Sequence, residues 1–259
     1  HLLARTRVPV ITTLHTILAR PGEDERWVMD AILARSTELI VMAERGREIL
    51  RSTYGVDDAR IHVIEHGVPD RPYVDPDTLK PRFGWQGRKV VLTFGLLAPD
   101  KGIESMIRAM PAIIAAEPET LYVVLGATHP NIVREQGEAL RNRLMALSQE
   151  LHVADHVRFI GSYIEQEELL DYLQAADIYV TPYVNPAQIT SGTLSYAVAM
   201  GKPVVSTPYI HATEILADDH GRLVPFGDSA ALADNLIALL ADEDLRRGYA
   251  TRAYQRGRG

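Results

Sequence analysis

The chain has 259 residues, of which 46% are hydrophobic and 24% charged, with a formal net charge of −7 and no cysteine. The apolar content excludes an intrinsically disordered chain, and the absence of cysteine excludes disulfides and thiolate chemistry. The acidic balance argues against a nucleic-acid-binding surface. No apolar run reaches the ~18 residues of a membrane span, and we expect no signal peptide. The composition therefore predicts a soluble cytoplasmic protein of one large or two smaller domains.

Short β-branched runs alternate with stretches of helical period along the chain. The first runs lie at 8–14, 38–42 and 61–64, with helical stretches at about 23–37 and 44–54. Six more runs follow, at 90–94, 122–125, 157–160, 178–181, 203–206 and 222–224. Nearly continuous apolar character is typical of parallel strands that are buried on both faces. The alternation with helices predicts doubly wound α/β sheets.

A proline-rich stretch at 68–86 interrupts this alternation and predicts a linker. It separates a first Rossmann-like domain at 1–67 from a second at 87–259. Only three strands precede the linker, whereas a complete sheet of this type has about six, so the first domain is predicted to be incomplete. The chain opens at His1 within a helix-like run and ends without a stop signal, and we therefore expect a fragment.

The residues that directly follow the strands are the most informative, because ligands of open parallel sheets bind beyond the carboxyl ends of the strands. Gly95 allows a tight turn after the strand at 90–94. Lys101 then stands at the start of a helix, where a cation and free amides can meet an anion. A solvated lysine in a turn is the simpler interpretation of this motif on its own.

A long polar loop after the strand at 178–181 carries the strongest signal. It passes Gln188 and Thr190 and leads into a helix. That helix opens with three small residues, Ser191, Gly192 and Thr193. Small residues at a helix N-terminus let a diphosphate approach the unpaired amides, whereas an ordinary Ser/Thr N-cap is the alternative. The length of the loop favours the phosphate site.

Four other residues after strands carry weaker signals. His15 ends the first strand and is predicted to face the cleft between the domains. Tyr163 is in position to border a nucleobase, although simple packing is the commoner role of a lone tyrosine. His66 is interpreted as a structural residue. His129, in a proline-containing loop, is interpreted as solvent-exposed.

Taken together, these residues resemble the GT-B glycosyltransferases, specifically the large family 4 (group 1) of retaining enzymes. The resemblance runs from about residue 8 to the C-terminus. It is most specific over 157–226, where Ala-Met-Gly-Lys-Pro-Val-Val-Ser-Thr at 199–207 is followed by Thr-Glu-Ile at 213–215. It implies an α/β GT-B fold of two Rossmann-like domains that face a cleft. Residues 1–67 would be the remnant of the acceptor-side domain, and 87–259 the nucleotide-sugar-binding domain.

The resemblance also implies roles for single residues. The family lysine that neutralises the donor diphosphate matches Lys101, but the arginine five residues earlier is Leu96 here. Two family glutamates, one by the sugar and one on the ribose, are replaced by Gln188 and Tyr196 at the same spacing. A family histidine near the phosphates and the acceptor hydroxyl matches His15. The expected catalytic residues are His15, Lys101 and Gln188. The expected donor-binding residues are Gly95, Lys101, Tyr163, Gln188, Thr190, Ser191, Gly192, Thr193 and Tyr196.

The implied activity is transfer of a sugar, with retention of configuration, from a nucleotide-sugar donor to a carbohydrate, lipid or other hydroxyl acceptor. No Asp-x-Asp motif lies near a strand end, so we expect neither a metal nor a cofactor. The uncharged Gln188 disfavours a double displacement. The departures at 188 and 196 keep open a catalytically silent nucleotide-sugar-binding module or regulatory partner. The third hypothesis for the function is another GT-B enzyme, such as an epimerase or a phosphorylase.

The small first domain has a structural consequence. Loss of the first strands of a doubly wound sheet leaves an inner strand as an open edge, which is a template for pairing with another chain. We therefore expect either self-association through that edge or poor order of residues 1–67.

Overall fold

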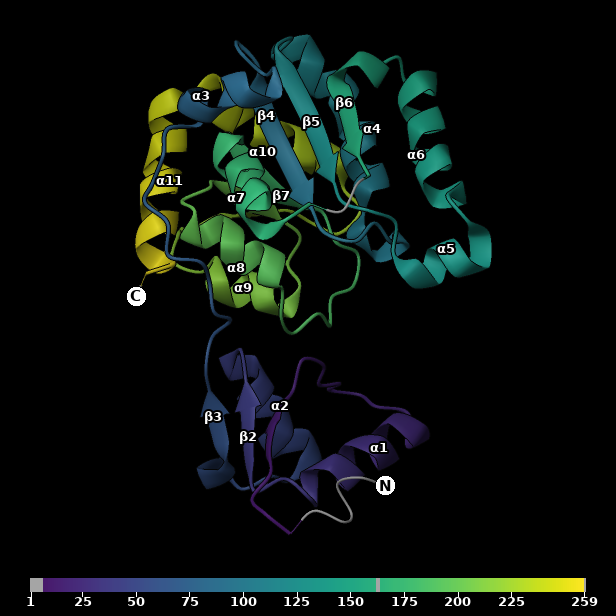
Figure 1. Cartoon of the computed structure of the whole chain (residues 1–259), viewed down its shortest axis with the longest axis vertical. Helices are drawn as coiled ribbons and strands as arrows, with labels where there is room; N and C mark the ends of the chain where they lie inside the picture. The colour runs from purple at the N-terminus through teal and green to yellow at the C-terminus, as the bar shows by residue number, and fades with distance from the viewer. Residues whose placement is uncertain (1–6, 162–163, 259) are drawn as a thin grey trace.

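The computed structural model describes residues 7–161 and 164–258, which form a small and a large lobe joined by an extended segment (Figure 1). The small lobe has three parallel strands in the order β1-β2-β3. Its elements are β1 (Ile11–Thr13), α1 (Glu23–Leu33), β2 (Glu38–Val41), α2 (Glu44–Tyr54) and β3 (Ile61–Val63). The strands expected in this part of the chain are thus confirmed, with slightly shorter bounds.

Both helices of the small lobe pack on the same face of its sheet. Two right-handed crossovers that run in the same direction place them there. Leu39 of β2 is buried in the core beside Ile49 of α2. On the other face, Ile11 is 65% exposed. β1 lies at the edge of this sheet, and no other strand of the described residues pairs with its free side.

The large lobe contains a six-stranded parallel sheet in the order β6-β5-β4-β7-β8-β9. Its strands are β4 (Lys89–Phe94), β5 (Thr120–Leu125), β6 (Val157–Ile160), β7 (Ile178–Thr181), β8 (Val204–Ser206) and β9 (Arg222–Leu223). The strand order reverses between β4 and β7. In open α/β sheets such a switch point leaves a crevice beyond the carboxyl ends of the strands, where ligands bind.

Helices cover both faces of this sheet. One core includes Met106 of α4, Leu144 of α6 and Leu236 of α10. The opposite core includes residues of α7, α8 and α9. The helices of the lobe are α3 (Pro76–Leu79), α4 (Ile103–Ala116), α5 (Pro130–Gln136), α6 (Ala139–Glu150), α7 (Gln166–Ala175), α8 (Gly192–Ala199), α9 (Ile210–Ile215), α10 (Ser229–Ala241) and α11 (Glu243–Arg256). Burial on both faces explains why every residue of β5 is buried and apolar patterning is nearly continuous.

The stretch at 68–86 is extended at first and then packs on the large lobe. Trp85 is only 3% exposed and lies beside the ring of Tyr172. Lys80 is 4% exposed, and its ammonium lies 2.9 Å from the carboxylate of Asp177. The second half of this stretch therefore contributes to the core of the large lobe.

The two lobes contact each other through α9 and the loop before α8. Ile189 of that loop packs in the core of the small lobe with Ile17. The carboxylate of Glu214 in α9 accepts hydrogen bonds from the backbone N–H groups of Glu44 (2.7 Å) and Arg45 (3.2 Å). The residue before α2 is an alanine, which offers no side-chain cap, so the other lobe caps this helix.

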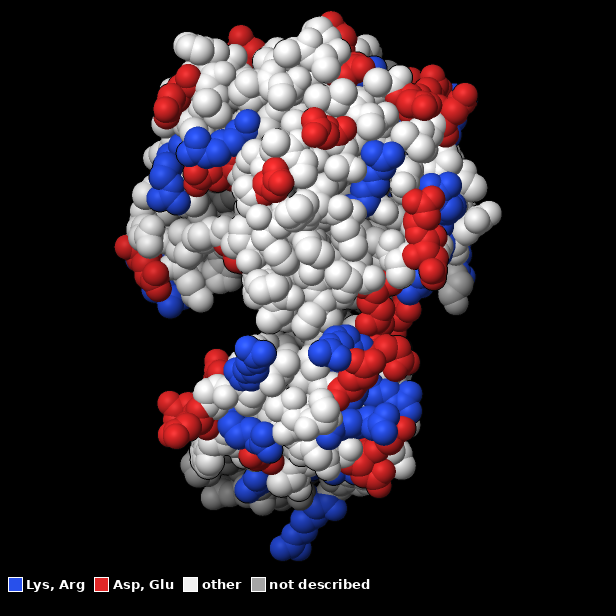
Figure 2. All heavy atoms as spheres, turned by 180° about the vertical axis from the view of Figure 1, so that it is seen from behind, with Lys and Arg blue, Asp and Glu red and all other residues white. Residues whose placement is uncertain are grey.

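Seen from behind, the surface is hollowed between the lobes and carries both signs of charge, without one continuous basic face (Figure 2). Within 7–161 and 164–258, no helix has the length and apolar character that crossing a bilayer requires. The same residues contain no group of three or more His, Asp or Glu side chains placed to hold a metal ion.

Candidate functional site

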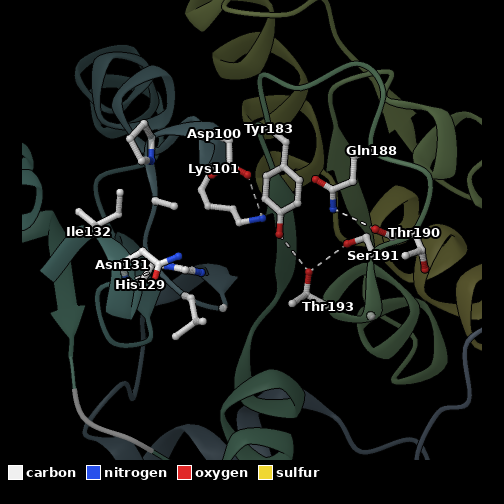
Figure 3. Close-up of a pocket in the computed structure, with 15 residues that line it drawn as sticks. Asp100, Lys101, His129, Asn131, Ile132, Tyr183, Gln188, Thr190, Ser191 and Thr193 are labelled. Carbon is white, nitrogen blue, oxygen red and sulfur yellow. Dashed lines mark hydrogen bonds and ion pairs between the residues drawn. The ribbon is translucent and has the colours of Figure 1, made fainter. Parts of the chain in front are cut away.

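A pocket of about 610 Å³ opens at the switch point of the large sheet, beyond β4 and β7 (Figure 3). Its lining comes from the loop after β4, the start of α5, Tyr183 two residues after the end of β7, and the loop before α8 with the first residues of that helix. Seven residues that the sequence singled out line it together: Gly95, Lys101, Gln188, Thr190, Ser191, Gly192 and Thr193. Strand order brings these two sequence-distant segments to one edge of the sheet.

Lys101 supplies the positive charge of the pocket. Its ammonium lies 4.2 Å from the centroid of the Tyr183 ring and 3.4 Å from a carboxylate oxygen of Asp100. The next residue, Gly102, has φ +63°, and a Cβ there would lie 1.8 Å from the carbonyl oxygen of Pro182. Only glycine allows this close approach of the two loops. The approach sets Lys101 directly against the end of β7.

The start of α8 supplies hydrogen-bond donors. The hydroxyl of Ser191 accepts from the N–H of Leu194 at 3.3 Å and caps the helix. The hydroxyl of Thr193 lies 3.2 Å from that of Ser191 and 3.0 Å from that of Tyr183. The N–H groups of Gly192 and Thr193, at the start of the same turn, have no partner within the helix and attract an anion. A cation and a helix N-terminus thus share one pocket.

Tyr183 connects these two halves of the site. It is 1% exposed, its ring lies under the Lys101 ammonium, and its hydroxyl pairs with Thr193. The ring also stacks on Tyr209, with centroids 5.3 Å apart. Tyr183 was not among the residues predicted from the sequence. Its position close after the end of β7 was the signal that could have identified it.

His211, at the start of α9, holds the loop before α8 in place. Its Nδ1 accepts from the backbone N–H of Ser191 at 2.9 Å, and its own backbone N–H donates to the carbonyl of Gln188 at 3.1 Å. Burial lowers the pKa of His211 to about 4, against the opposing influence of Glu65. The ring is therefore neutral at neutral pH and keeps its acceptor nitrogen. His211 was not predicted from the sequence, although it lies in the segment after the carboxyl end of β8.

The predicted residues outside this pocket lie elsewhere. His15 is exposed on the small lobe after β1 and does not line the pocket. The ring of Tyr196 faces His66 edge-on, with centroids 6.0 Å apart, on α8 next to the extended segment. Tyr163 lies outside the described residues. Roles for these three tyrosine and histidine side chains in donor or acceptor binding stay predictions.

The prediction that His129 is solvent-exposed is wrong. The side chain is half-buried and lines the pocket. Its backbone N–H donates to the carbonyl of Leu97 at 2.9 Å, which holds the loop after β5 against the loop after β4. This contact between two loops is tertiary, and the proline next to His129 gave no sign of it.

The two-lobed arrangement is that of the GT-B glycosyltransferases. Sucrose-phosphate synthase from Thermosynechococcus elongatus superposes with a TM-score of 0.81 at 24% identity, over 99% of this chain and 65% of that one. Anabaena HepE in complex with UDP and glucose superposes with a TM-score of 0.80 at 19% identity, over 97% of this chain and 67% of that one. The predicted GT-B fold of two Rossmann-like domains is confirmed.

The chain belongs to the family of glycosyl transferases group 1, whose model matches residues 76–256. The model of glycosyltransferase family 4 matches residues 1–71. A phosphatidyl-myo-inositol mannosyltransferase from Mycolicibacterium smegmatis is 28% identical over 96% of this chain and 60% of that protein. A D-inositol 3-phosphate glycosyltransferase from Xylanimonas cellulosilytica is 30% identical over 96% of this chain and 62% of that protein. The chain spans about 60% of the length of these relatives.

Proposed function

We propose that this chain binds a nucleotide-sugar donor and belongs to an enzyme that transfers the sugar to an acceptor hydroxyl. The observation that carries the proposal is the convergence of Lys101 with the start of α8 at the switch point of the sheet. A nucleoside diphosphate is the leaving group of such a reaction, and it departs with negative charge. A fixed cation and free amides stabilise that charge without reorganising during the reaction.

Each residue of the pocket has a separate role in the proposed sugar transfer. The acceptor oxygen attacks the anomeric carbon while the bond to the diphosphate oxygen breaks and its electron pair passes to the diphosphate, which takes up the proton that the acceptor hydroxyl loses. Lys101 and the first-turn amides of α8 stabilise that oxygen's charge. Tyr183 keeps Lys101 and Thr193 aligned through its ring face and its hydroxyl. Gln188 donates from its Nε2 to the carbonyl of Thr190 at 3.1 Å, which leaves its amide oxygen for a sugar hydroxyl.

Retention of configuration and independence of a metal ion form part of this proposal. The resemblance to the family implies that Gln188 occupies the position of the carboxylate that a double displacement would need, which favours direct attack from the leaving-group side. Lys101 and the amides supply the positive charge that the diphosphate requires. Relatives named for mannosyl transfer and for inositol phosphate make mannose donors and polyol or lipid-linked acceptors the first candidates to test.

Substitution of Lys101 tests the donor site. A thermal-shift panel of UDP-, GDP- and ADP-sugars first identifies the donor, because a ligand that binds the folded form raises its melting temperature. We expect Lys101→Ala to weaken binding of that donor roughly tenfold to a hundredfold in calorimetry, with unchanged melting temperature of the free protein. Arg108→Ala is the control, since Arg108 pairs with Glu104 on the surface of α4. Undiminished affinity of Lys101→Ala would remove Lys101 from the site.

The second candidate is a silent nucleotide-sugar-binding module. The departures at Gln188 and Tyr196 favour it, because each stands where the resemblance implies a glutamate and neither side chain has a carboxylate. Release of nucleoside diphosphate from the donor, with and without acceptor, separates the two functions. Donor binding without any release of nucleoside diphosphate would favour the silent module.

A further inference from the structure

The loops after β4 and β5 run side by side beyond the sheet. Leu97 and Thr128 form an isolated parallel bridge. The N–H of Leu97 donates to the carbonyl of Ala127, and the N–H of His129 donates to the carbonyl of Leu97, both at 2.9 Å. Side chains alternate along extended strands. Leu97 (2% exposed) and Thr128 (4% exposed) point inward, so Leu96 and His129 point together to the opposite side, where both line the pocket.

The hydrogen bonds of His129 fix the role of each ring nitrogen. Its Nδ1 accepts from the backbone N–H of Asn131 at 3.2 Å and caps α5. A neutral imidazole whose Nδ1 is an acceptor carries its proton on Nε2 and is a donor there. In the described part of the chain, no hydrogen bond engages Nε2. In Figure 3, Lys101 lies in the middle, with His129 and Asn131 on one side of it and Tyr183 on the opposite side.

The side chains that line the pocket offer little positive charge for a diphosphate. Among the described residues that line it, Lys101 alone carries a full positive charge, and Asp100 offsets part of that charge at 3.4 Å. A diphosphate carries about two negative charges. Leu96, beside His129, is 46% exposed and has no hydrogen-bonding group. Histidine is also not among the residue types that N-caps prefer, so the cap alone does not explain the imidazole.

We infer that His129 is a further donor-binding residue whose Nε2–H donates to an oxygen of the donor diphosphate. The inference rests on the proposed function, since it assigns a second contact in the same pocket. His129 and Lys101 then hold the diphosphate from two different loops, while the amides of α8 contact it from a third segment.

His129→Ser tests the inference, because serine is a preferred N-cap and preserves the start of α5 while removing the Nε2 donor. We expect the affinity for the nucleoside diphosphate identified in the panel to fall about tenfold or more, as for the loss of a hydrogen bond to a charged group. Binding of the corresponding nucleoside monophosphate should change much less. The double variant Leu96→Arg/His129→Ser should recover affinity for the diphosphate, because residue 96 points to the same side. His220→Ser is the control, since His220 lies in the turn after α9 and bonds to the carbonyl of Ala217.

The outcomes separate the two proposals. Wild-type protein that binds no nucleoside diphosphate overturns the proposed function and this inference with it. Wild-type binding that His129→Ser leaves unchanged overturns the inference alone. Equal losses of affinity for the diphosphate and the monophosphate would mean that His129 contacts the nucleoside, and would also overturn the inference. A lower melting temperature of His129→Ser with full affinity would reduce His129 to a cap of α5.

Discussion

Acidification should release the loop before α8 through protonation of a single buried histidine. His211 is 4% exposed and accepts the Ser191 N–H on its Nδ1. A proton on Nδ1 abolishes that acceptor and places a charge on a buried ring. Because the same ring holds Ser191, the N-cap of α8, acid is expected to lower stability and to disturb the donor pocket together.

The size and sign of this effect follow from the two pKa values. Burial lowers the pKa of His211 from 6.5 to about 4 in the folded protein. Between these values the unfolded chain binds a proton that the folded chain does not, so the free energy of unfolding falls as the pH drops. The interval corresponds to about 3 kcal/mol, at ~1.4 kcal/mol per pH unit. This part of the free energy of unfolding is fully present above pH 6.5 and is lost by about pH 4.

Urea unfolding at a series of pH values between 7.5 and 4 measures this loss, for example through the fluorescence of the buried Trp85. His211→Asn is the matched variant, because an asparagine oxygen can accept the Ser191 N–H but does not titrate in this range. We expect the wild type to lose about 3 kcal/mol more than His211→Asn across the series. His152→Asn, at an exposed position, should behave as the wild type. Parallel pH dependences of the wild type and His211→Asn would refute the reasoning.

Three further predictions concern the scaffold. Burial lowers the pKa of Lys202 from 10.5 to about 7, so the unfolded chain keeps a proton that the folded chain loses, and stability should rise with pH across this interval. Lys202→Met should abolish that rise in the same urea assay. Gly102→Ala should lower stability by at least ~2 kcal/mol in urea unfolding, because its Cβ would collide with the Pro182 carbonyl. Gly84→Ala, with φ +70° but no atom within 4 Å of the new Cβ, should lower it by only about 1 kcal/mol. The open edge of β1 should cause concentration-dependent self-association in light scattering, and a monodisperse monomer at all concentrations would contradict this.

Much of the fold could be predicted from the sequence because strand burial leaves a local pattern. The runs at 120–125 and 178–181 are buried on both faces, and their apolar residues are correspondingly continuous. Lys101 and Ser191 were found by the same local logic, since each lies between a strand and the α-helix that follows it. The bounds of the first helix were less accurate, because the stretch predicted to reach residue 37 ends at Leu33.

The residues that sequence analysis misjudged all depend on contacts between loops. Tyr183, after β7, has its role because its ring contacts the ammonium of Lys101, which lies in the loop after β4. His211 acts through the amide of Ser191, and His129 enters the pocket because its loop pairs with Leu97. A residue's own neighbours along the chain contain no trace of such a pairing, since it arises only when strands and loops from different βαβ units are assembled.

The sequence by itself determined the α/β class, the positions of the strands and the family, because periodicity and motif spacing are properties of short segments. The tertiary structure alone decided which segments share the pocket. The strand order sets β4 next to β7, and that adjacency brings Lys101 to Tyr183 and Thr193. Strand order results from the packing of all the helices and strands together, so no single segment encodes it.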